Sequence, residues 1–445
     1  AAPATEAPPA DPIEAAIQRS KTLIPGVWTW GADARLRHET FINSGKFSRQ
    51  APNNEEHFQR YRARWWTTIT PVNDVEFYTR LTWEGRNYCR PLNPGSVGHR
   101  DWMDERDEVI IDNLYLKLSN IGGSPVTLQA GRFDVTLGDG WLVYEGGPLD
   151  GSRTYYFDGG RILLDLKDIK TTVDTYYLYT DAEGDAWFPK LKDNDIPPFM
   201  VEEDEHGVVV YVTNKSLPKT QIEPYFIYKN GQHEFVNGRR AGIDSDIYTF
   251  GTRVTGDVGD HWRYSVNLAG QFGHKGDQDQ CALGSNNRLS YLFKDTWKNE
   301  LYMDYEYLSG DKDSTRGRNE GFDILWGRYP RWDELYGFTF ANETRTFDYT
   351  NMHRVSYGWK AMPTKKAEVG LRYDLLFADK KPFENTGIFG DGCFRGQMIV
   401  PYFKYTFNSH LFTRVMPFFF FPGDYYAKSN NDPSTFFRWE IHFTW

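Results

Sequence analysis

The stretch STFFRWEIHFTW, residues 434–445, alternates between apolar and polar side chains. In an extended chain one face carries Phe437, Trp439, Ile441, Phe443 and Trp445, and the other carries Phe436, Arg438, Glu440, His442 and Thr444. A repeat of two residues is typical of a β-strand whose two faces meet different surroundings. The stretch therefore predicts a strand, either in the wall of a barrel or at the edge of a soluble sheet.

Composition narrows the class of protein. The chain has 445 residues, 40% of them hydrophobic, a formal net charge of -10 and a mean hydropathy of -0.64. Its apolar runs are far shorter than the roughly 20 residues of a membrane helix, which excludes a helical membrane protein. The acidic charge without a basic segment argues against a nucleic-acid partner. Three cysteines are too few for a disulfide framework.

The same alternation recurs along the whole chain in about eighteen segments. Each segment is longer than the roughly 5–6 residues of a soluble strand and long enough for the roughly 9–11 that a tilted strand needs to cross a bilayer. We therefore predict an all-β fold, a single antiparallel up-and-down transmembrane β-barrel. The strands are predicted at 26–40, 57–70, 73–85, 107–119, 124–136, 154–166, 170–181, 206–215, 219–230, 243–257, 261–275, 285–295, 297–309, 350–361, 365–379, 395–408, 410–421 and 434–445.

The predicted connections alternate between short and long. Tight turns follow every second strand, whereas the other links are long: 41–56, 86–106, 137–153, 182–205, 231–242, 276–284, 310–349, 380–394 and 422–433. Outer-membrane barrels have short periplasmic turns and long external loops. The pattern predicts a bacterial outer-membrane location with lipid around the barrel. The aromatic residue that closes the last strand resembles the assembly signal of such barrels.

The number of strands decides which face meets water. Side chains just fill a barrel of about eight strands, so eighteen strands leave a wide lumen. We therefore expect the apolar faces to meet lipid, where one Arg or Lys costs about 2–4 kcal/mol at the midplane, and the charged faces to surround water. Aromatic clusters near strand ends are expected to form interfacial girdles. The predicted pore-lining residues are Arg35, Arg37, Arg60, Arg62, Arg64, Arg80, Arg132, Arg161, Arg372, Arg438, Glu300, Asp304, Glu306 and Asp374.

Three stretches resemble the alginate export porin family. They are LQAGRFDVTLGDGWLVYEGG at 128–147, TYYFDGGRI at 154–162 and FFPGDYY at 420–426. The resemblance implies a monomeric eighteen-stranded barrel that carries polar or polyanionic material through an arginine-rich lumen. It places Arg132 and Arg161 in that lumen. The acidic residues predicted to share the lumen do not suit strictly anionic cargo.

The predicted function is a passive outer-membrane channel for polar or anionic solutes such as sugar acids, carboxylates or an anionic polysaccharide. Arginine suits this role because its planar guanidinium donates to carboxylates. A second interpretation is that the charges pair with one another and brace a nonspecific pore. A barrel that sheathes a periplasmic or surface partner is another alternative. An outer-membrane hydrolase is less favoured, since no Ser-His-Asp spacing stands out, and we expect neither an enzyme nor a cofactor.

The chain outside the strands carries further expectations. Residues 1–24 are expected to form a flexible Ala/Pro-rich segment of an exported mature chain, with a short helix over 13–22 and a possible periplasmic partner, and 25–445 to form the barrel. The loop at 310–349 either folds inward as a constriction or caps the surface.

Two smaller features remain open. The carboxylates at 202–207 and 310–321 are of a type that binds calcium, but neither run has EF-hand spacing, and a solvated loop is the favoured interpretation. Cys89, Cys281 and Cys393 fall in predicted external loops, where two of them could form a disulfide in an oxidising compartment.

Overall fold

The computed structural model confirms the barrel. It describes residues 20–51, 54–90, 109–145, 156–182, 203–236, 239–312, 317–328, 332–344, 348–381 and 387–445. Within these ranges, 18 long antiparallel strands form one closed sheet. No helix in this part of the chain is long and apolar enough to cross a membrane.

The long strands keep the predicted order. They are β2 (Trp28–Ile42), β3 (Glu55–Val72), β4 (Val75–Arg90), β5 (Val109–Leu118), β6 (Val126–Phe133), β9 (Phe157–Leu166), β10 (Thr171–Thr180), β11 (Glu203–Asn214), β12 (Thr220–Val236), β14 (Ser245–Val258), β15 (Trp262–Lys275), β16 (Gln278–Leu292), β17 (Glu300–Leu308), β19 (Met352–Ala361), β20 (Ala367–Phe377), β21 (Phe394–Thr406), β22 (Leu411–Pro422) and β23 (Ser434–Thr444).

Short elements accompany the wall. The short strands are β1 (Thr22–Ile24), β7 (Val135–Thr136), β8 (Tyr144–Glu145), β13 (Arg239–Ala241) and β18 (Arg318–Asn319). The 3-10 turns are η2 (Ile121–Gly123), η3 (Lys167–Ile169), η4 (Tyr336–Asn342) and η5 (Lys428–Asn430).

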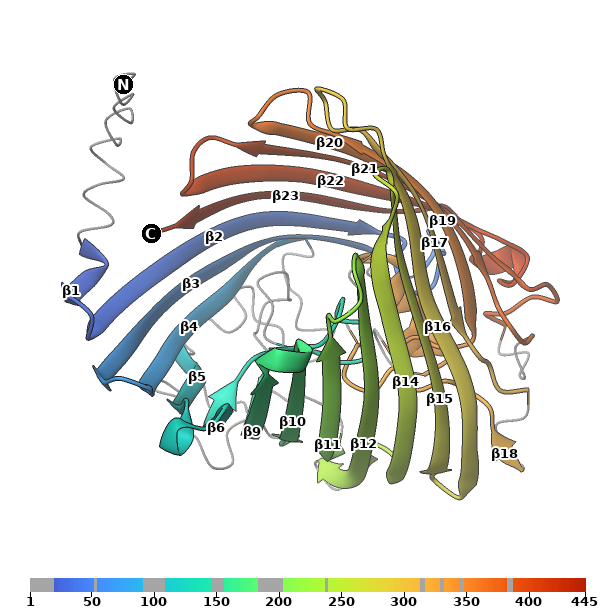
Figure 1. The fold of residues 1–445 in the computed structure, drawn as a ribbon. Helices are drawn as coiled ribbons and strands as arrows, with labels where there is room; N and C mark the ends of the chain where they lie inside the picture. The colour runs from blue at the N-terminus through green and yellow to red at the C-terminus, as the bar shows by residue number, and fades with distance from the viewer. Residues whose placement is uncertain are drawn as a thin grey trace.

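The first and last long strands close the barrel. β2 pairs with β23 from Asp33↔Thr444 to Ile42↔Thr435, and the two strands lie side by side in Figure 1. The last residue, Trp445, stacks on Trp30 at 6.2 Å between ring centroids. Among the described residues, every long strand therefore pairs with two neighbours, as closure of a barrel requires.

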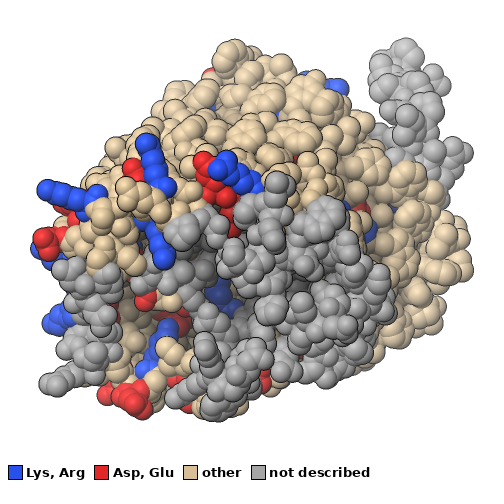
Figure 2. All heavy atoms as spheres, turned by 180° about the vertical axis from the view of Figure 1, so that it is seen from behind, with Lys and Arg blue, Asp and Glu red and all other residues tan. Residues whose placement is uncertain are grey.

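The two faces of the wall differ as the alternation predicts. In β14, Phe250 is 53% exposed, whereas its neighbour Thr249 is 0% exposed. Leu268 and Leu283 are also exposed, while Gln271 is buried on the inside. Figure 2 shows a broad surface nearly free of charged residues, with most of the visible Lys, Arg, Asp and Glu gathered toward one side. Apolar side chains thus form the outer surface, which is the energetically favoured arrangement in lipid.

Two predicted long loops are wrong. The segment 276–284 was expected to be a loop, but β15 and β16 are joined by Gly276 and Asp277 alone. At 231–242, β12 continues to Val236 and pairs with β13 as a hairpin. Polar, Gly-containing sequence suggested loops at both places, yet the strands extend beyond the apolar band, where they no longer need a lipid-facing side.

The structure describes only the last residues of the predicted N-terminal segment, 1–24. The predicted helix 13–22 falls almost entirely outside the described residues, as do residues 1–19 of the expected flexible segment. Thr22–Ile24, however, forms β1, which pairs with the start of β2. The segment up to residue 24 is therefore not wholly unstructured.

Loop segments fold into the barrel and supply its apolar core. Trp141 of the β6–β9 connection stacks on Phe322 of the β17–β19 connection at 5.6 Å. The backbones of the two connections also bond directly, with Trp326 N–H donating to the Leu142 carbonyl at 3.0 Å. Gly327 permits this approach, because a Cβ there would lie 1.8 Å from the Trp141 carbonyl oxygen. The segments 321–328 and 332–344 therefore lie mainly inside the barrel, whereas Arg318–Asn319 forms β18 and pairs with the start of β16.

In the aromatic run Phe418–Phe421, only alternate side chains are placed to join the predicted interfacial girdle. In the Phe418–Phe421 run, Phe419 and Phe421 are exposed on the lipid side, but Phe418 and Phe420 are buried inside. Phe420 packs against Phe47 and Tyr336 at 5.0 and 4.8 Å. A continuous aromatic run in a strand must divide between the two faces, and here the inward half meets the folded-in loop.

Candidate functional site: an arginine wall inside the barrel

Eight arginines project inward from five neighbouring strands around the closure seam. We call this set the arginine wall: Arg35, Arg37, Arg60, Arg62, Arg64, Arg86, Arg414 and Arg438. The strand register places Arg35 opposite Arg62 and Arg37 opposite Arg60. Arg60 in turn lies opposite Arg86 of β4. Like charges directly opposite each other destabilise a sheet, so this arrangement has an energetic cost that the fold alone does not require.

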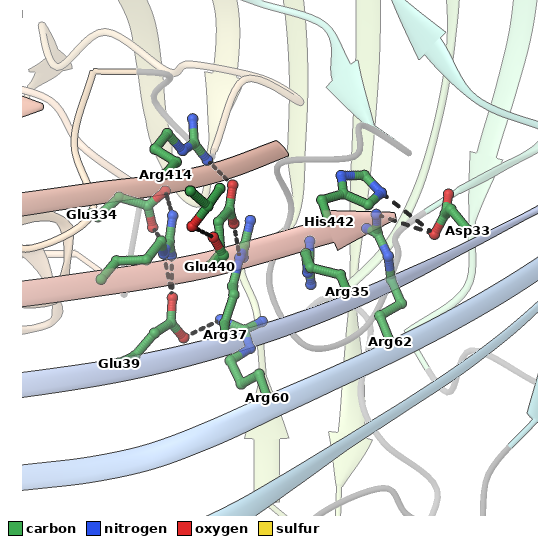
Figure 3. Close-up of polar contacts among 12 residues, drawn as sticks. Asp33, Arg35, Arg37, Glu39, Arg60, Arg62, Glu334, Arg414, Glu440 and His442 are labelled. Carbon is green, nitrogen blue, oxygen red and sulfur yellow. Dashed lines mark hydrogen bonds and ion pairs between the residues drawn. The ribbon is translucent and has the colours of Figure 1, made fainter. Parts of the chain in front are cut away.

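Two glutamates hold the seam side of the wall together. Glu440 pairs with Arg37 at 2.6 Å and with Arg414 at 2.7 Å. Glu39 accepts from Arg60 at 2.8 Å and also pairs with Arg438. Figure 3 shows these side chains pointing into one shared space. Each glutamate thus serves two arginines.

The other side of the wall is more loosely paired. Arg64 donates to Asp33 at 2.8 Å, while Arg62 lies 3.8 Å from the same carboxylate. Glu84 lies 3.5 Å from Arg35 and 4.0 Å from Arg62, beyond good hydrogen-bond distance. These longer separations are ion pairs with little directional bonding.

Positive charge is in excess within this site. In the described part of the chain, its eight arginines meet five carboxylates: Asp33, Glu39, Glu84, Glu334 and Glu440. Arg60 Nε and Nη2 are buried and find no hydrogen-bond partner among the described residues. A buried donor without a partner costs about 1–3 kcal/mol, and more when it is charged. An anion that enters this space would meet guanidinium groups that are incompletely satisfied.

Three predicted arginines lie elsewhere and are fully matched. Arg80 is held by Asp112 at 2.8 Å and Asp134 at 2.9 Å. Arg132 binds Asp158 through two bonds of 2.8 and 2.9 Å, and Arg161 pairs with Asp174 at 2.6 Å. Paired bonds of this kind are strong and geometrically fixed. These residues, including the two carried over from the family motifs, brace the wall between β4 and β10.

The predicted acids form a second balanced group on β16–β20. Arg354 bridges Glu306 at 3.3 Å and Asp374 at 3.2 Å. Arg372 pairs with Asp374 at 2.8 Å, Arg288 pairs with Asp304 at 2.6 Å, and Glu300 pairs with Lys360 at 2.9 Å near the short-turn end. Arg288 and Arg354 were missed by sequence reasoning, because only the strand register places them opposite Asp304 and Glu306. The acids therefore carry little free negative charge.

Most of the predicted residues are less open than a wide pore would make them. Ten of the fourteen are buried, and the partly exposed ones are Arg64, Arg161, Arg372 and Glu300. The inward loop explains part of this burial. Its Glu334 accepts from Arg438 at 2.6 Å, and the Trp332 carbonyl accepts from Arg372. The segment 332–344 thus lies against the arginine wall.

A second anchor of the same segment was not predicted. Arg395 donates to both carboxylate oxygens of Glu343 at 2.6 and 2.7 Å and to the Tyr336 hydroxyl at 3.0 Å. Its guanidinium also lies 4.2 Å from the ring centre of Tyr425. The only sequence signal was an acid within a long aromatic loop, which does not identify its partner.

Asp333 ends the turn that leads into η4. Its Oδ1 accepts from the backbone N–H groups of Tyr336 at 2.7 Å and Leu335 at 3.1 Å. Its Oδ2 is buried without a hydrogen-bond partner among the described residues. Burial raises the pKa of Asp333 to about 7, against the smaller opposing effect of the Tyr336 N–H; the nearby Glu334 raises it further.

This burial predicts a pH-dependent attachment of the segment. Between about pH 4 and pH 7 the packed segment keeps the proton on Asp333, whereas a released segment would lose it. Attachment should therefore weaken as the pH rises through this range. The hydrogen-exchange protection factor over 332–344, which corrects for the base-catalysed intrinsic exchange rate, should be higher at about pH 5 than at about pH 8. The Asp333→Asn variant keeps the Oδ1 acceptor and should show no such change; an unchanged pH dependence in it would contradict this assignment.

The structure places two of the three cysteines and one of the two acidic runs in strands. Cys89 lies in β4 and Cys281 in β16 rather than in loops, and all three cysteines are free. The acidic run at 202–207 lies largely in β11, where Glu205 pairs with Lys229 at 2.7 Å and with Arg328. The run at 310–321 falls partly outside the described residues, and the preference for a solvated loop over a calcium site there stays a prediction.

Comparison with solved structures supports the architecture. OccAB4 of Acinetobacter baumannii shares 12% identity with a TM-score of 0.57, covering 94% of this chain and 97% of that chain. OccK1 (OpdK) of Pseudomonas aeruginosa shares 13% with a TM-score of 0.56, covering 94% and 98%. OccK2 (OpdF) of Pseudomonas aeruginosa in complex with glucuronate shares 12% with a TM-score of 0.56, covering 94% and 97%. Likenesses at this identity establish the fold.

Sequence comparison establishes the family. No curated protein matches the chain. A family model described as alginate export matches residues 29–436, which is nearly the whole barrel. The match agrees with the closed outer-membrane porin fold and with the three motif stretches of the sequence. The chain is therefore a member of the alginate export family, a bacterial outer-membrane β-barrel with the fold of a channel.

Proposed function

We propose that this barrel is a passive channel for solutes that carry carboxylate groups, such as sugar acids or an anionic polysaccharide. The observation that carries the proposal is the set of arginines opposite one another on β2, β3 and β4. Their mutual repulsion would be relieved each time an anion passes. Guanidinium is suited to carboxylates because it donates two parallel bonds. The glucuronate complex of the OccK2 porin is consistent with this class of solute.

The arrangement also suits release of the solute. Four of the five carboxylates around the wall already accept hydrogen bonds from arginine, so an incoming anion competes with Glu39, Glu440 or Asp33 for the same donors. The affinity of each position for an anion is therefore reduced by this competition. Conduction needs sites that are attractive enough to enter and weak enough to leave. No cofactor or catalytic group takes part in this proposal.

The direct test is the reversal potential in planar bilayers. Under a potassium chloride gradient, we expect stepwise ohmic currents whose reversal potential has the sign of anion preference. Glucuronate should interrupt the current at concentrations where neutral glucose does not. A reversal potential of cation-selective sign would reject the proposal, and one near zero would reject it in favour of a braced, nonspecific pore. A barrel with no conductance would favour the sheath, and one that also hydrolyses esters or peptides would favour the enzyme.

A further inference from the structure

A series of neighbouring short turns is rich in lysine. The turns that follow β9, β11, β14, β16 and β19 are residues 167–170, 215–219, 259–261, 293–299 and 362–366. Together they contain eight lysines and three aspartates. This is a clear local reversal of charge, because the whole chain has a formal net charge of -10. In this architecture the short turns are the periplasmic end of the barrel.

These lysines are exposed and mostly unengaged. We call them the lysine collar: Lys167, Lys170, Lys215, Lys219, Lys294, Lys298, Lys365 and Lys366. Lys219 donates to the Gly259 carbonyl at 3.1 Å and lies 3.8 Å from Asp260, and Lys366 donates to the Phe407 carbonyl at 2.8 Å. The other six ammonium groups have no ion pair or hydrogen bond among the described residues. Their charge is therefore available to a ligand.

Part of the collar faces the lumen. A hollow of about 350 Å³ lies between the turns after β11 and β14 and is lined by Lys215, Lys219, Gln221, Asp257 and Arg263. Gln221 alternates in phase with Glu223, which is buried inside the barrel, and Arg263 in phase with buried Asn267. Arg263 pairs with Asp257 at 3.0 Å, so the lining keeps a net positive charge. The hollow thus opens on the inner side of the periplasmic mouth.

The collar is spaced to act as one surface. Neighbouring strands lie roughly 4.8 Å apart, so successive short turns, two strands apart, are about 10 Å from each other. That distance matches the Debye length of about 10 Å at 0.1 M salt, so the fields of adjacent turns overlap. Charge of one sign at the mouth of a cleft raises the local concentration and entry rate of the opposite ion.

We propose that the lysine collar captures anionic solutes at the periplasmic mouth and passes them to the arginine wall. The hollow formed by Lys215, Lys219 and Arg263 is the first binding site on this path. The inference rests on the proposed function for the class of solute, but it adds a second, separate site at the opposite end from the long loops. It also makes the two mouths unequal: carboxylate-bearing solutes enter faster from the periplasmic side.

The test measures block of single channels of known orientation. A biotin at the N-terminus, which precedes β1 on the short-turn side, reports orientation through streptavidin added to one chamber. Citrate, with three carboxylates, and glucuronate, with one, are added to either side at 0.1 M and 1 M salt. The wild-type channel should show a higher association rate from the periplasmic side at low salt, more so for citrate. The difference should vanish at 1 M, where the Debye length is about 3 Å.

Two variants with equal charge change sharpen the result. K215Q/K219Q/R263Q should lower the periplasmic association rate of citrate by roughly tenfold, the low end of electrostatic steering, and leave the other side unchanged. K46Q/K312Q/K428Q changes exposed lysines of the long loops and should spare the periplasmic rate. Equal rates from both sides in an anion-selective wild-type channel would overturn the collar while leaving the arginine wall intact. Phospholipid headgroups or an acidic periplasmic protein would then be the remaining partners for these lysines.

Discussion

Replacing Arg37, Arg60 and Arg62 with glutamine should shift the channel from anion toward cation preference. The three side chains lie next to one another across β2 and β3 and are buried in the arginine wall. One unit charge at 4 Å is worth about 4 kcal/mol at an effective dielectric of 20. A change of about 1.4 kcal/mol in a barrier is tenfold in rate. We therefore expect the chloride-to-potassium permeability ratio, taken from reversal potentials, to fall at least roughly tenfold.

The choice of these three positions protects the fold, because each neighbouring carboxylate keeps another arginine. Glu440 retains Arg414, Glu39 retains Arg438, and Asp33 retains Arg64. The matched control is R37K/R60K/R62K, which preserves charge but loses the planar fork. It should keep the selectivity and weaken block by glucuronate. If the glutamine variant folds and its reversal potential stays at the wild-type value, the arginine wall does not select the ion.

Replacing Arg395 with alanine should detach the 332–344 segment from the barrel wall. The change leaves Glu343, Tyr336 and Tyr425 without their central donor. Removing one partner of a buried ion pair costs about 3–5 kcal/mol, because the remaining charge is uncompensated. The barrel strands do not depend on this contact, so we expect the loss to appear as release of the segment. Single-channel conductance should rise, and hydrogen exchange over 332–344 should accelerate.

A charge exchange separates this explanation from general damage. The double variant R395E/E343R restores an ion pair between the same two positions and should recover part of the lost protection. R253Q affects a pair outside this segment, Arg253–Glu223 at 2.6 Å, and should leave exchange over 332–344 unchanged. A wild-type conductance for R395A together with faster exchange would show that the segment lies beside the ion path and does not restrict it.

Much of the wall could be predicted from sequence because its cause is local. In β14 and β23, lipid on one side and polar surroundings on the other impose a repeat of two residues, which a single strand already displays. The two-residue repeat is lost where a strand extends beyond the lipid, because no apolar face is needed there. β16 begins at Gln278, whereas the predicted strand begins at residue 285. The first residues of β16 include Gln, Asp and Cys and show no clear apolar face, so the sequence pattern does not indicate a strand there.

The identity of ionic partners could not be predicted in the same way. Alternation places Arg37 inward, but its partner Glu440 lies 403 positions away and is set by closure of the barrel. The same holds for Glu343 and Arg395, which meet only because a loop folds into the interior. Inward folding depends on the stacking of Trp141 on Phe322 and on the contact of Trp326 with Phe157, and contacts of that kind have no sequence period.

The order of charges at the closure seam has a consequence for assembly. Arg37 lies opposite Glu440 and Glu39 opposite Arg438. Sliding β23 by two residues would preserve the inward and outward faces, so lipid could not distinguish the misaligned barrel from the native one. In one direction the slide sets Glu39 against Glu440, and in the other it sets Arg37 against Arg438. The charges at the seam therefore favour the native register, since both registers that are shifted by two residues place like charges opposite each other.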